Sequence, residues 1–148
     1  MDAGDRRTRR TVLGAVVASA LVVAVSSCSS PSTAASCADW VDFTGAQEMS
    51  DAADIVITSE SVTRDGTEVL LGVDAHAYEV VVETVEQGDA TPGETIRVIS
   101  TPDTCGPSSP YADGDPLDVD RPVRLYLGPA GPGWSTLTPF DGVEHLGW

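Results

Sequence analysis

The clearest alternation of apolar and polar residues lies between positions 76 and 84. A period of two predicts a β-strand with one apolar and one polar face. The apolar face consists of Tyr78, Val80 and Val82. Val81 interrupts the other face, which carries Glu79 and Glu83, and this interruption predicts a central strand that is partly covered on both sides.

Shorter runs of the same kind flank this strand. A β-branched run starts at Ile55 and continues through Val62, and Arg64-Asp65-Gly66 is a turn signal before a further apolar run at 69–71. Further strands are expected at 95–99, 123–127 and 134–137, and 134–137 is expected to be the last strand. Arg97 is expected to lie across from Glu79 or Glu83 in the neighbouring strand.

Only one helix is expected. Thr44-Gly45-Ala46-Gln47 is typical of a capping box, in which the Thr44 oxygen meets the Gln47 amide, and a short helix follows through about Ala52. Residues 101–122 are rich in Pro, Gly, Ser and Asp, which indicates a long irregular connection. Five or six short strands with one brief N-terminal helix predict a mainly β fold, a small closed or nearly closed barrel.

A different pattern occupies positions 1–27. Four arginines at positions 6, 7, 9 and 10 precede an uncharged run, rich in Ala, Val and Leu, from Thr11 to Val25. Because a membrane-spanning helix needs about 20 apolar residues, this shorter run predicts a cleaved signal peptide. The segment from Thr8 to Leu13 resembles a twin-arginine motif, so the general secretory and twin-arginine export routes both stay open.

The apolar run ends in Val25-Ser26-Ser27-Cys28, which resembles the lipobox of bacterial lipoproteins. The resemblance implies cleavage before Cys28, acylation of Cys28 with fatty chains such as palmitate, and attachment to the extracytoplasmic face of the cell membrane. Acyl chains contribute about 0.8 kcal/mol for each buried methylene. The alternative is an ordinary secretory signal cut nearby, which leaves Cys28 as a thiol or a disulfide partner.

The chain beyond the signal peptide divides in two. Residues 28–36 form the lipidated cysteine and a flexible Ser-rich linker that spans on the order of 15 Å. Residues 37–148 have the length of one domain, the expected β-barrel.

The charge of this mature chain excludes one class of partner. Removal of positions 1–27 leaves four of the eight basic residues and 21 of the 23 acidic ones, so the net charge is −17. Such a chain repels phosphate backbones and anionic lipid headgroups, so a nucleic-acid partner is excluded. The domain is expected to be tethered to its membrane but repelled by it.

The three cysteines are assigned by elimination. If Cys28 carries the lipid, Cys37 and Cys105 remain as a pair in an oxidising compartment, where a disulfide is the default. A bond from Cys28 to either of the other two would require the lipobox interpretation to be wrong.

The order of these features resembles the netrin and tissue-inhibitor-of-metalloproteinase type of OB-fold, as found in small exported bacterial proteins. The resemblance rests on Cys37, Ala53–Ile57, Tyr78–Val82, Val85–Gly88, Cys105-Gly106 and Val123–Leu127. It implies an OB-like barrel. The protease inhibitors of this type place a free N-terminal cysteine on the protease zinc. Because Cys28 is expected to be acylated and Cys37 is internal, the inhibitory role is not implied for this chain.

Residues suited to catalysis are scarce. The chain has two histidines, His76 and His145, and neither accompanies a Gly-x-Ser-x-Gly elbow or a spare cysteine. Asp74 shares a strand face with His76, but a histidine at a strand end is commonly structural. We therefore expect no catalytic residue, no enzyme activity and no cofactor, and a small hydrolase is kept only as an alternative.

The acidic segment 113–120 offers candidate calcium ligands. Its carboxylates are Asp113, Asp115, Asp118 and Asp120. Calcium takes about six to eight oxygen ligands, and a calcium-binding envelope protein is the alternative function. The segment lacks the EF-hand order, so a solvated loop is the favoured interpretation and no metal is expected.

Aromatic residues near the C-terminus are the candidates for binding a partner protein of the cell envelope. They are Trp134, Phe140 and Trp148. An exposed apolar patch of this kind marks an interaction site, although the same residues could seal one end of the barrel. The sequence therefore predicts a membrane-anchored, non-enzymatic binding or envelope module.

Overall fold

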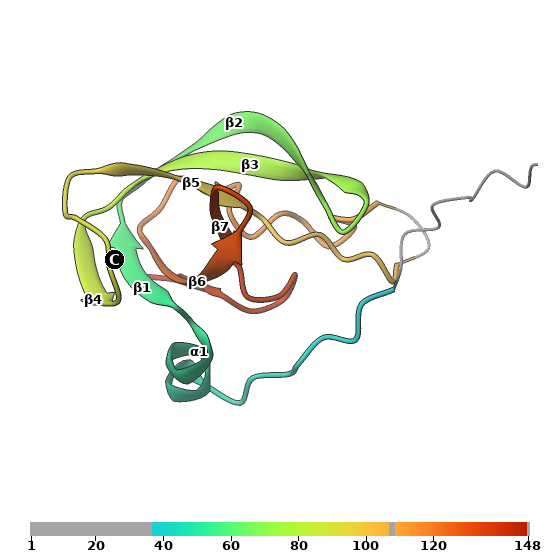
Figure 1. The fold of residues 1–148 in the computed structure, drawn as a ribbon, viewed down its shortest axis with the longest axis horizontal. Helices are drawn as coiled ribbons and strands as arrows, with labels where there is room; N and C mark the ends of the chain where they lie inside the picture. Colours follow the sequence, from blue (N-terminus) through green and yellow to red (C-terminus); the bar gives the residue numbers. More distant parts are fainter. Residues whose placement is uncertain (1–36, 107–108, 148) are drawn as a thin grey trace, which may run out of the picture. The chain divides into compact units, whose positions relative to one another are not determined.

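The computed structural model describes residues 37–106 and 109–147, and these form a mainly β fold with one short helix (Figure 1). The predicted signal peptide, Cys28, the linker and Trp148 lie outside the described residues. No helix in the described part of the chain is long and apolar enough to cross a membrane. The elements in chain order are α1 (Ala46–Ala52), β1 (Ile55–Ser59), β2 (Ser61–Leu70), β3 (Val73–Val81), β4 (Thr84–Gln87), β5 (Thr95–Ile99), β6 (Val123–Ala130), β7 (Gly133–Thr136) and β8 (Val143–His145).

The eight strands form an open mixed sheet. Its order is β2-β3-β5-β7-β6-β1-β4, and β8 pairs with β6. All pairs are antiparallel except β5 and β7. The predicted mainly β class is confirmed, but the described residues form an open sheet of eight strands instead of the predicted closed or nearly closed barrel of five or six. Two predicted strands are each divided into two, since only Glu60 separates β1 from β2, and only two residues separate β3 from β4.

The main core lies on one face of this sheet. It contains buried side chains of β1, β3, β5 and β6, together with Val82 and with Leu117 of the long connection between β5 and β6. The predicted apolar face of β3 is confirmed, because Tyr78, Val80 and Val82 are buried. The predicted partial covering of its other face is also confirmed, because Ala75 and Ala77 are fully buried there, whereas Val81 at the end of the strand is 39% exposed. The strand is central because β2 and β5 pair with its two edges.

Helix α1 covers a second, smaller core. Met49 packs on a cluster formed by Ala53, Val56 and Tyr126. Tyr126 lies on the face of β6 opposite to Leu125 and Leu127, so β6 is buried on both faces. This second covered face explains why Tyr126 is buried although it lies opposite the core face of β6.

The capping of α1 differs from the prediction. The N-cap residue is Gly45, and no side chain caps the helix. The Thr44 amide donates to the Glu48 carboxylate at 2.8 Å, and this hydrogen bond lowers the pKa of Glu48. The Gln47 side chain instead donates to Asp51 at 2.9 Å, one turn further along the helix.

The turn predicted at Arg64-Asp65-Gly66 is a bulge. Strand β2 continues through these residues, and its register with β3 shifts between Arg64 and Thr67. Gly66 has a φ of 82°, which a bulge accommodates and an ordinary strand residue does not. The chain reverses further on, at Leu71 and Gly72, where φ is 54° and 81°.

Arg97 lies opposite Glu79 in the register of β5 and β3, as predicted. Its guanidinium is bonded elsewhere, to the Asp65 carboxylate of the β2 bulge, with Glu68 at 3.8 Å. The strand predicted at 134–137 appears as β7. It is not the last strand, because β8 follows and pairs with β6. Three residues were too few for the pattern at 143–145 to stand out.

Gly88 lies against the backbone of the residues that begin β1. Its φ is 83°, and a Cβ atom there would lie 2.3 Å from the Asp54 carbonyl oxygen. Gly93 has a similar φ of 87° but open space around it. We expect Gly88→Ala to lower the free energy of unfolding by about 1 to 3 kcal/mol more than Gly93→Ala, because only the first substitution adds a clash. Urea unfolding of both variants measures the difference, and equal losses would contradict the close approach.

Candidate functional site

The most connected polar group in the described chain is the carboxylate of Asp115, whose side chain is 4% exposed. Its Oδ2 atom lies 2.6 Å from Nδ1 of His76 and accepts a hydrogen bond of 2.6 Å from the Tyr78 hydroxyl. Its Oδ1 atom accepts from the Ser100 hydroxyl at 2.7 Å and from the Leu117 amide at 3.0 Å. We call these four side chains, Asp115, His76, Tyr78 and Ser100, the Asp115 cluster.

Three elements bring the cluster together. His76 and Tyr78 are two positions apart on β3 and so point to the same face. Ser100 follows β5 directly, and its amide donates to the His76 carbonyl at 2.8 Å. Asp115 comes from the long connection, and Leu117, two residues later, is fully buried in the main core. The cluster therefore fastens the connection to the sheet.

Tyr111 extends the cluster toward the surface. Its hydroxyl donates to the Ser100 carbonyl at 2.7 Å and accepts from the His76 amide at 2.9 Å. Its ring stacks on the imidazole of His76, with the ring centroids 4.0 Å apart and the planes 21° from parallel. Burial raises the pKa of the Tyr111 phenol, so the hydroxyl stays protonated and able to donate.

The hydroxyl of Tyr78, within the cluster, also stays protonated. Burial, and then the hydrogen bond to Asp115, raise the pKa of Tyr78 well above its ordinary range. Its ring lies under the guanidinium of Arg64, 5.5 Å from the ring centroid. Tyr78 therefore serves as a hydrogen-bond donor to the carboxylate rather than as a base.

The pairing of His76 with Asp115 has the form of the base half of a catalytic triad. The imidazole is 27% exposed. Ser100, however, is buried and donates to Asp115 instead of to His76. Within residues 37–106 and 109–147, no hydroxyl or thiol is hydrogen-bonded to Nε2 of His76, so these residues assemble no nucleophile and base in the triad arrangement.

The predicted calcium candidates are not brought together. Asp113, Asp118 and Asp120 are exposed, whereas Asp115 points inward and is satisfied by protein donors. In the described part of the chain, no three Asp, Glu, His or Cys side chains come close enough to hold a metal ion. His145, the other histidine, is exposed, with Nε2 3.1 Å from the Pro116 carbonyl.

The predicted partner-binding aromatics separate in the structure. Trp134 of β7 packs against the main core, and Trp148 lies outside the described residues. Phe140 is 61% exposed and stands at the edge of a small pocket, which we call the Phe140 pocket. Its lining consists of Asp103, Pro110, Tyr111, Ala112, Asp113, Gly114, Pro139 and Phe140. The pocket thus adjoins the Asp115 cluster through Tyr111.

A second concave surface lies at the end of the β2–β3 hairpin. It is lined by Trp40, Leu70, Leu71, Thr101 and Ser135 to Leu137, and its walls are mostly apolar. Val69 on the hairpin is 68% exposed. The indole nitrogen of Trp40 is buried and has no hydrogen-bond partner among the described residues. The sequence pattern did not identify this groove.

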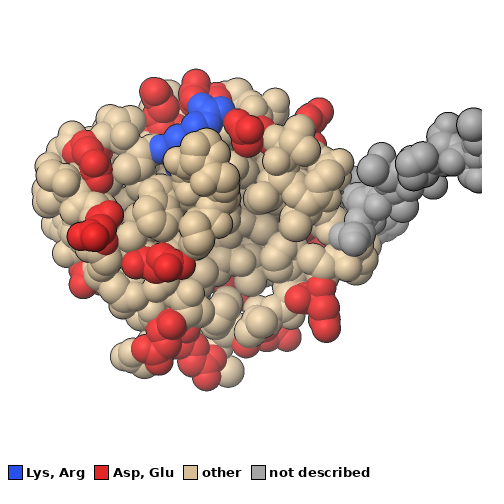
Figure 2. All heavy atoms as spheres, in the orientation of Figure 1, with Lys and Arg blue, Asp and Glu red and all other residues tan. Residues whose placement is uncertain are grey.

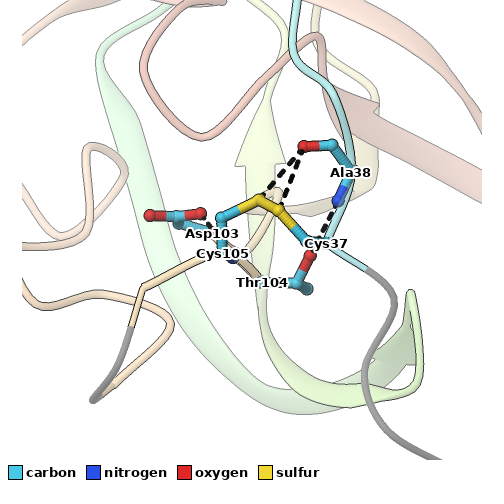
Figure 3. Close-up of a disulfide and its surroundings, with 5 residues drawn as sticks. All are labelled: Cys37, Ala38, Asp103, Thr104 and Cys105. Atoms are coloured by element: carbon cyan, nitrogen blue, oxygen red, sulfur yellow. Dashed lines mark hydrogen bonds between the residues drawn. A yellow bond between two sulfur atoms is a disulfide. The ribbon is translucent and has the colours of Figure 1, made fainter.

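The predicted disulfide between Cys37 and Cys105 is confirmed (Figure 3). The Ala38 amide next to it donates to the Thr104 hydroxyl at 3.4 Å, and the Cys105 amide donates to Asp103 at 2.9 Å. The first described residue is thereby joined to the long connection that also carries Asp115.

Acidic side chains are spread over the face drawn in Figure 2, where basic side chains gather in one place. Two arginines are engaged by acids: Arg97 by Asp65, and Arg124 by Glu86 and Glu144, each at 3.0 Å. These pairs leave most carboxylates of the domain without a basic partner, so its surface attracts cations.

Comparison with known proteins gives no family assignment. No protein-family model matches the sequence, and neither the curated proteins nor the solved structures searched contain a significant match. The function is therefore argued from the residues themselves.

Proposed function

We propose that the chain is an exported bacterial lipoprotein, held on the extracytoplasmic face of the cell membrane by acylated Cys28. The observation that carries the proposal is the disulfide between Cys37 and Cys105. This bond uses two of the three cysteines and leaves Cys28, at the end of the apolar run, to the lipid. A disulfide also suits a protein that leaves the reducing cytoplasm.

The strand order supports an OB-like barrel for the anchored domain. Strand β2 continues β1 after Glu60, and β4 continues β3, so two bent chain segments each contribute to both ends of the sheet. Counted as single strands, they reduce the path to five strands, with β8 as an addition. A partly open, five-stranded Greek-key barrel has the same form. The parallel pairing of β5 with β7 joins its two halves.

We further propose that the domain binds a partner in the cell envelope rather than catalysing a reaction. Two features support binding: the Phe140 pocket and the apolar groove beside the β2–β3 hairpin. Exposed large apolar side chains beside a concavity are typical of interaction sites. The hydrogen bonds of Asp115 supply a structural reason for its burial, so no reaction is needed to explain it.

The anchor is tested by fractionation of cells that express the full chain. We expect the unaltered protein, cleaved before Cys28, in the detergent-soluble membrane fraction. We expect no cleaved Cys28→Ala protein in that fraction, because the thiol that accepts the lipid is gone. Ser30→Ala is the control, since it alters a neighbouring linker residue and keeps the thiol. A processed Cys28→Ala protein that still partitions with the membrane would contradict acylation at this position.

A further inference from the structure

The walls of the Phe140 pocket are held by hydrogen bonds within the protein. Thr138 fixes the turn that carries the aromatic ring, because its hydroxyl accepts from the amides of Phe140 at 3.2 Å and Asp141 at 2.8 Å. On the opposite side, the Asp103 amide donates to the Pro110 carbonyl at 3.1 Å. Fixed walls reduce the conformational entropy that a ligand must remove when it binds.

The aromatic side chains of the pocket have different environments. Tyr111 is anchored through its hydroxyl and its stacking on His76, so its position is set by the Asp115 cluster. Phe140 is 61% exposed and has no role in either the main or the second core. An aromatic ring that is carried on a hydrogen-bonded turn and left in solvent offers a π face to a ligand.

The lining of the pocket contains two acidic side chains and no basic one, and the nearest basic side chain shown to act on it is Arg64, which affects Tyr111. Asp103 and Asp113 both line it, and neither takes part in any ion pair formed by the described residues. Arg97 and Arg124 are already engaged by other carboxylates. The combination of an aromatic face with nearby carboxylates favours a cation, and it disfavours an anionic ligand or an uncharged aliphatic one.

We propose that the Phe140 pocket binds an organic cation, a guanidinium or ammonium group, as the ligand site of the proposed binding module. The ring of Phe140 supplies the face on which the cation rests, and Asp103 and Asp113 supply the opposite charge. A flat guanidinium suits this arrangement best, because it stacks on an aromatic ring while its N–H groups meet carboxylates. The inference rests on the proposed binding function but does not depend on the lipid anchor.

Saturation-transfer difference NMR on the detergent-extracted full protein tests the proposal. The probes are acetyl-Gly-Arg-Gly-amide, agmatine, and the matched peptide with uncharged citrulline in place of arginine. We expect both cations to bind and the citrulline peptide to bind at least about fivefold more weakly, since it keeps the planar group and loses only the charge. Stronger binding of the arginine peptide than of agmatine identifies a partner protein's side chain as the source, and the reverse order identifies a small free organic cation.

Matched variants separate the pocket from the general negative charge. We expect Phe140→Leu to weaken binding of the arginine peptide about two- to fivefold, and Asp103→Asn with Asp113→Asn to weaken it about tenfold. Asp39→Asn with Asp42→Asn removes the same charge outside the pocket lining and should change the affinity less than twofold. Equal effects of the two double variants, or no effect of Phe140→Leu, would overturn the proposal.

The experiments distinguish a failure of the cation-binding proposal from a failure of the lipoprotein proposal. A protein that carries acyl chains but binds neither cation contradicts the pocket alone. A protein that binds the arginine peptide through Phe140 but lacks acyl chains contradicts the anchor alone.

Discussion

Replacing Asp115 with alanine is expected to lower the free energy of unfolding by about 3 to 5 kcal/mol, because it removes the shared acceptor of a buried cluster. The hydroxyls of Tyr78 and Ser100 would lose their partner, as would the imidazole of His76. The connection that carries Leu117 into the core would also lose one of its two links to β3 and keep only the contact of Tyr111 with His76. Urea unfolding of the mature protein, followed by circular dichroism, measures the loss.

Two further variants show whether the loss comes from burial. Asp115→Asn keeps the shape and one acceptor, so a smaller loss is expected. Asp118→Ala, in the same connection, removes an exposed carboxylate and should change the free energy of unfolding by no more than about 0.5 kcal/mol. If Asp115→Ala were no more damaging than Asp118→Ala, the cluster would not fasten the connection.

Removal of the disulfide is expected to have an effect of similar size. The bond joins residues 68 positions apart, and the chain-entropy model gives about 4 kcal/mol for closing a loop of this length. The double variant Cys37→Ala with Cys105→Ala should therefore unfold at a much lower urea concentration than the unaltered protein.

A reducing agent provides the control for this variant. It should destabilise the unaltered protein by a similar amount and leave the double variant unchanged, because only the first contains a bond to reduce. Equal unfolding midpoints for the oxidised and reduced forms of the unaltered protein would contradict a stabilising role for the disulfide.

Local alternation was sufficient to predict much of the sheet. The apolar face of β3 and residues 95–98 of β5 follow a period of two, which reports directly on burial. The same reasoning missed the bends that divide two of the predicted strands. The bend at Glu60, for example, depends on the different strands that β1 and β2 pair with and not on local sequence. This reasoning also misplaced a turn at Gly66, since a glycine with positive φ serves a bulge as well as it serves a turn.

The Asp115 cluster could not be predicted from sequence pattern. Asp115 is one of several aspartates in an acidic segment, and their common interpretation as solvated or metal-binding residues treats them alike. A lone leucine, Leu117, within a polar connection is a signal that the segment turns inward, but it lies even closer to the exposed Asp118 and so does not single out Asp115. Its partners on β3, Tyr78 and His76, are also 37 and 39 positions away in the sequence, and only the fold brings them close to Asp115.

The pocket around Phe140 was partly visible in the sequence. Phe140 was one of the three aromatic residues predicted to bind a partner, and the structure leaves its side chain exposed. Trp134, grouped with it, packs on the core because β7 places it in the middle of the sheet, next to β5 and β6. Spacing within a strand does not show which face of a sheet a lone tryptophan occupies unless the neighbouring strands are known.

Intact-mass spectrometry of the protein purified from membranes tests the central claim most directly, because it reports the cleavage position, the acyl mass and the cysteine oxidation state together. We predict a chain that begins at Cys28, carries fatty acyl chains, and is lighter by two hydrogens than its reduced form. A mass that still includes residues 1–27, or one that shows cleavage without any acyl chain, would contradict the lipoprotein account.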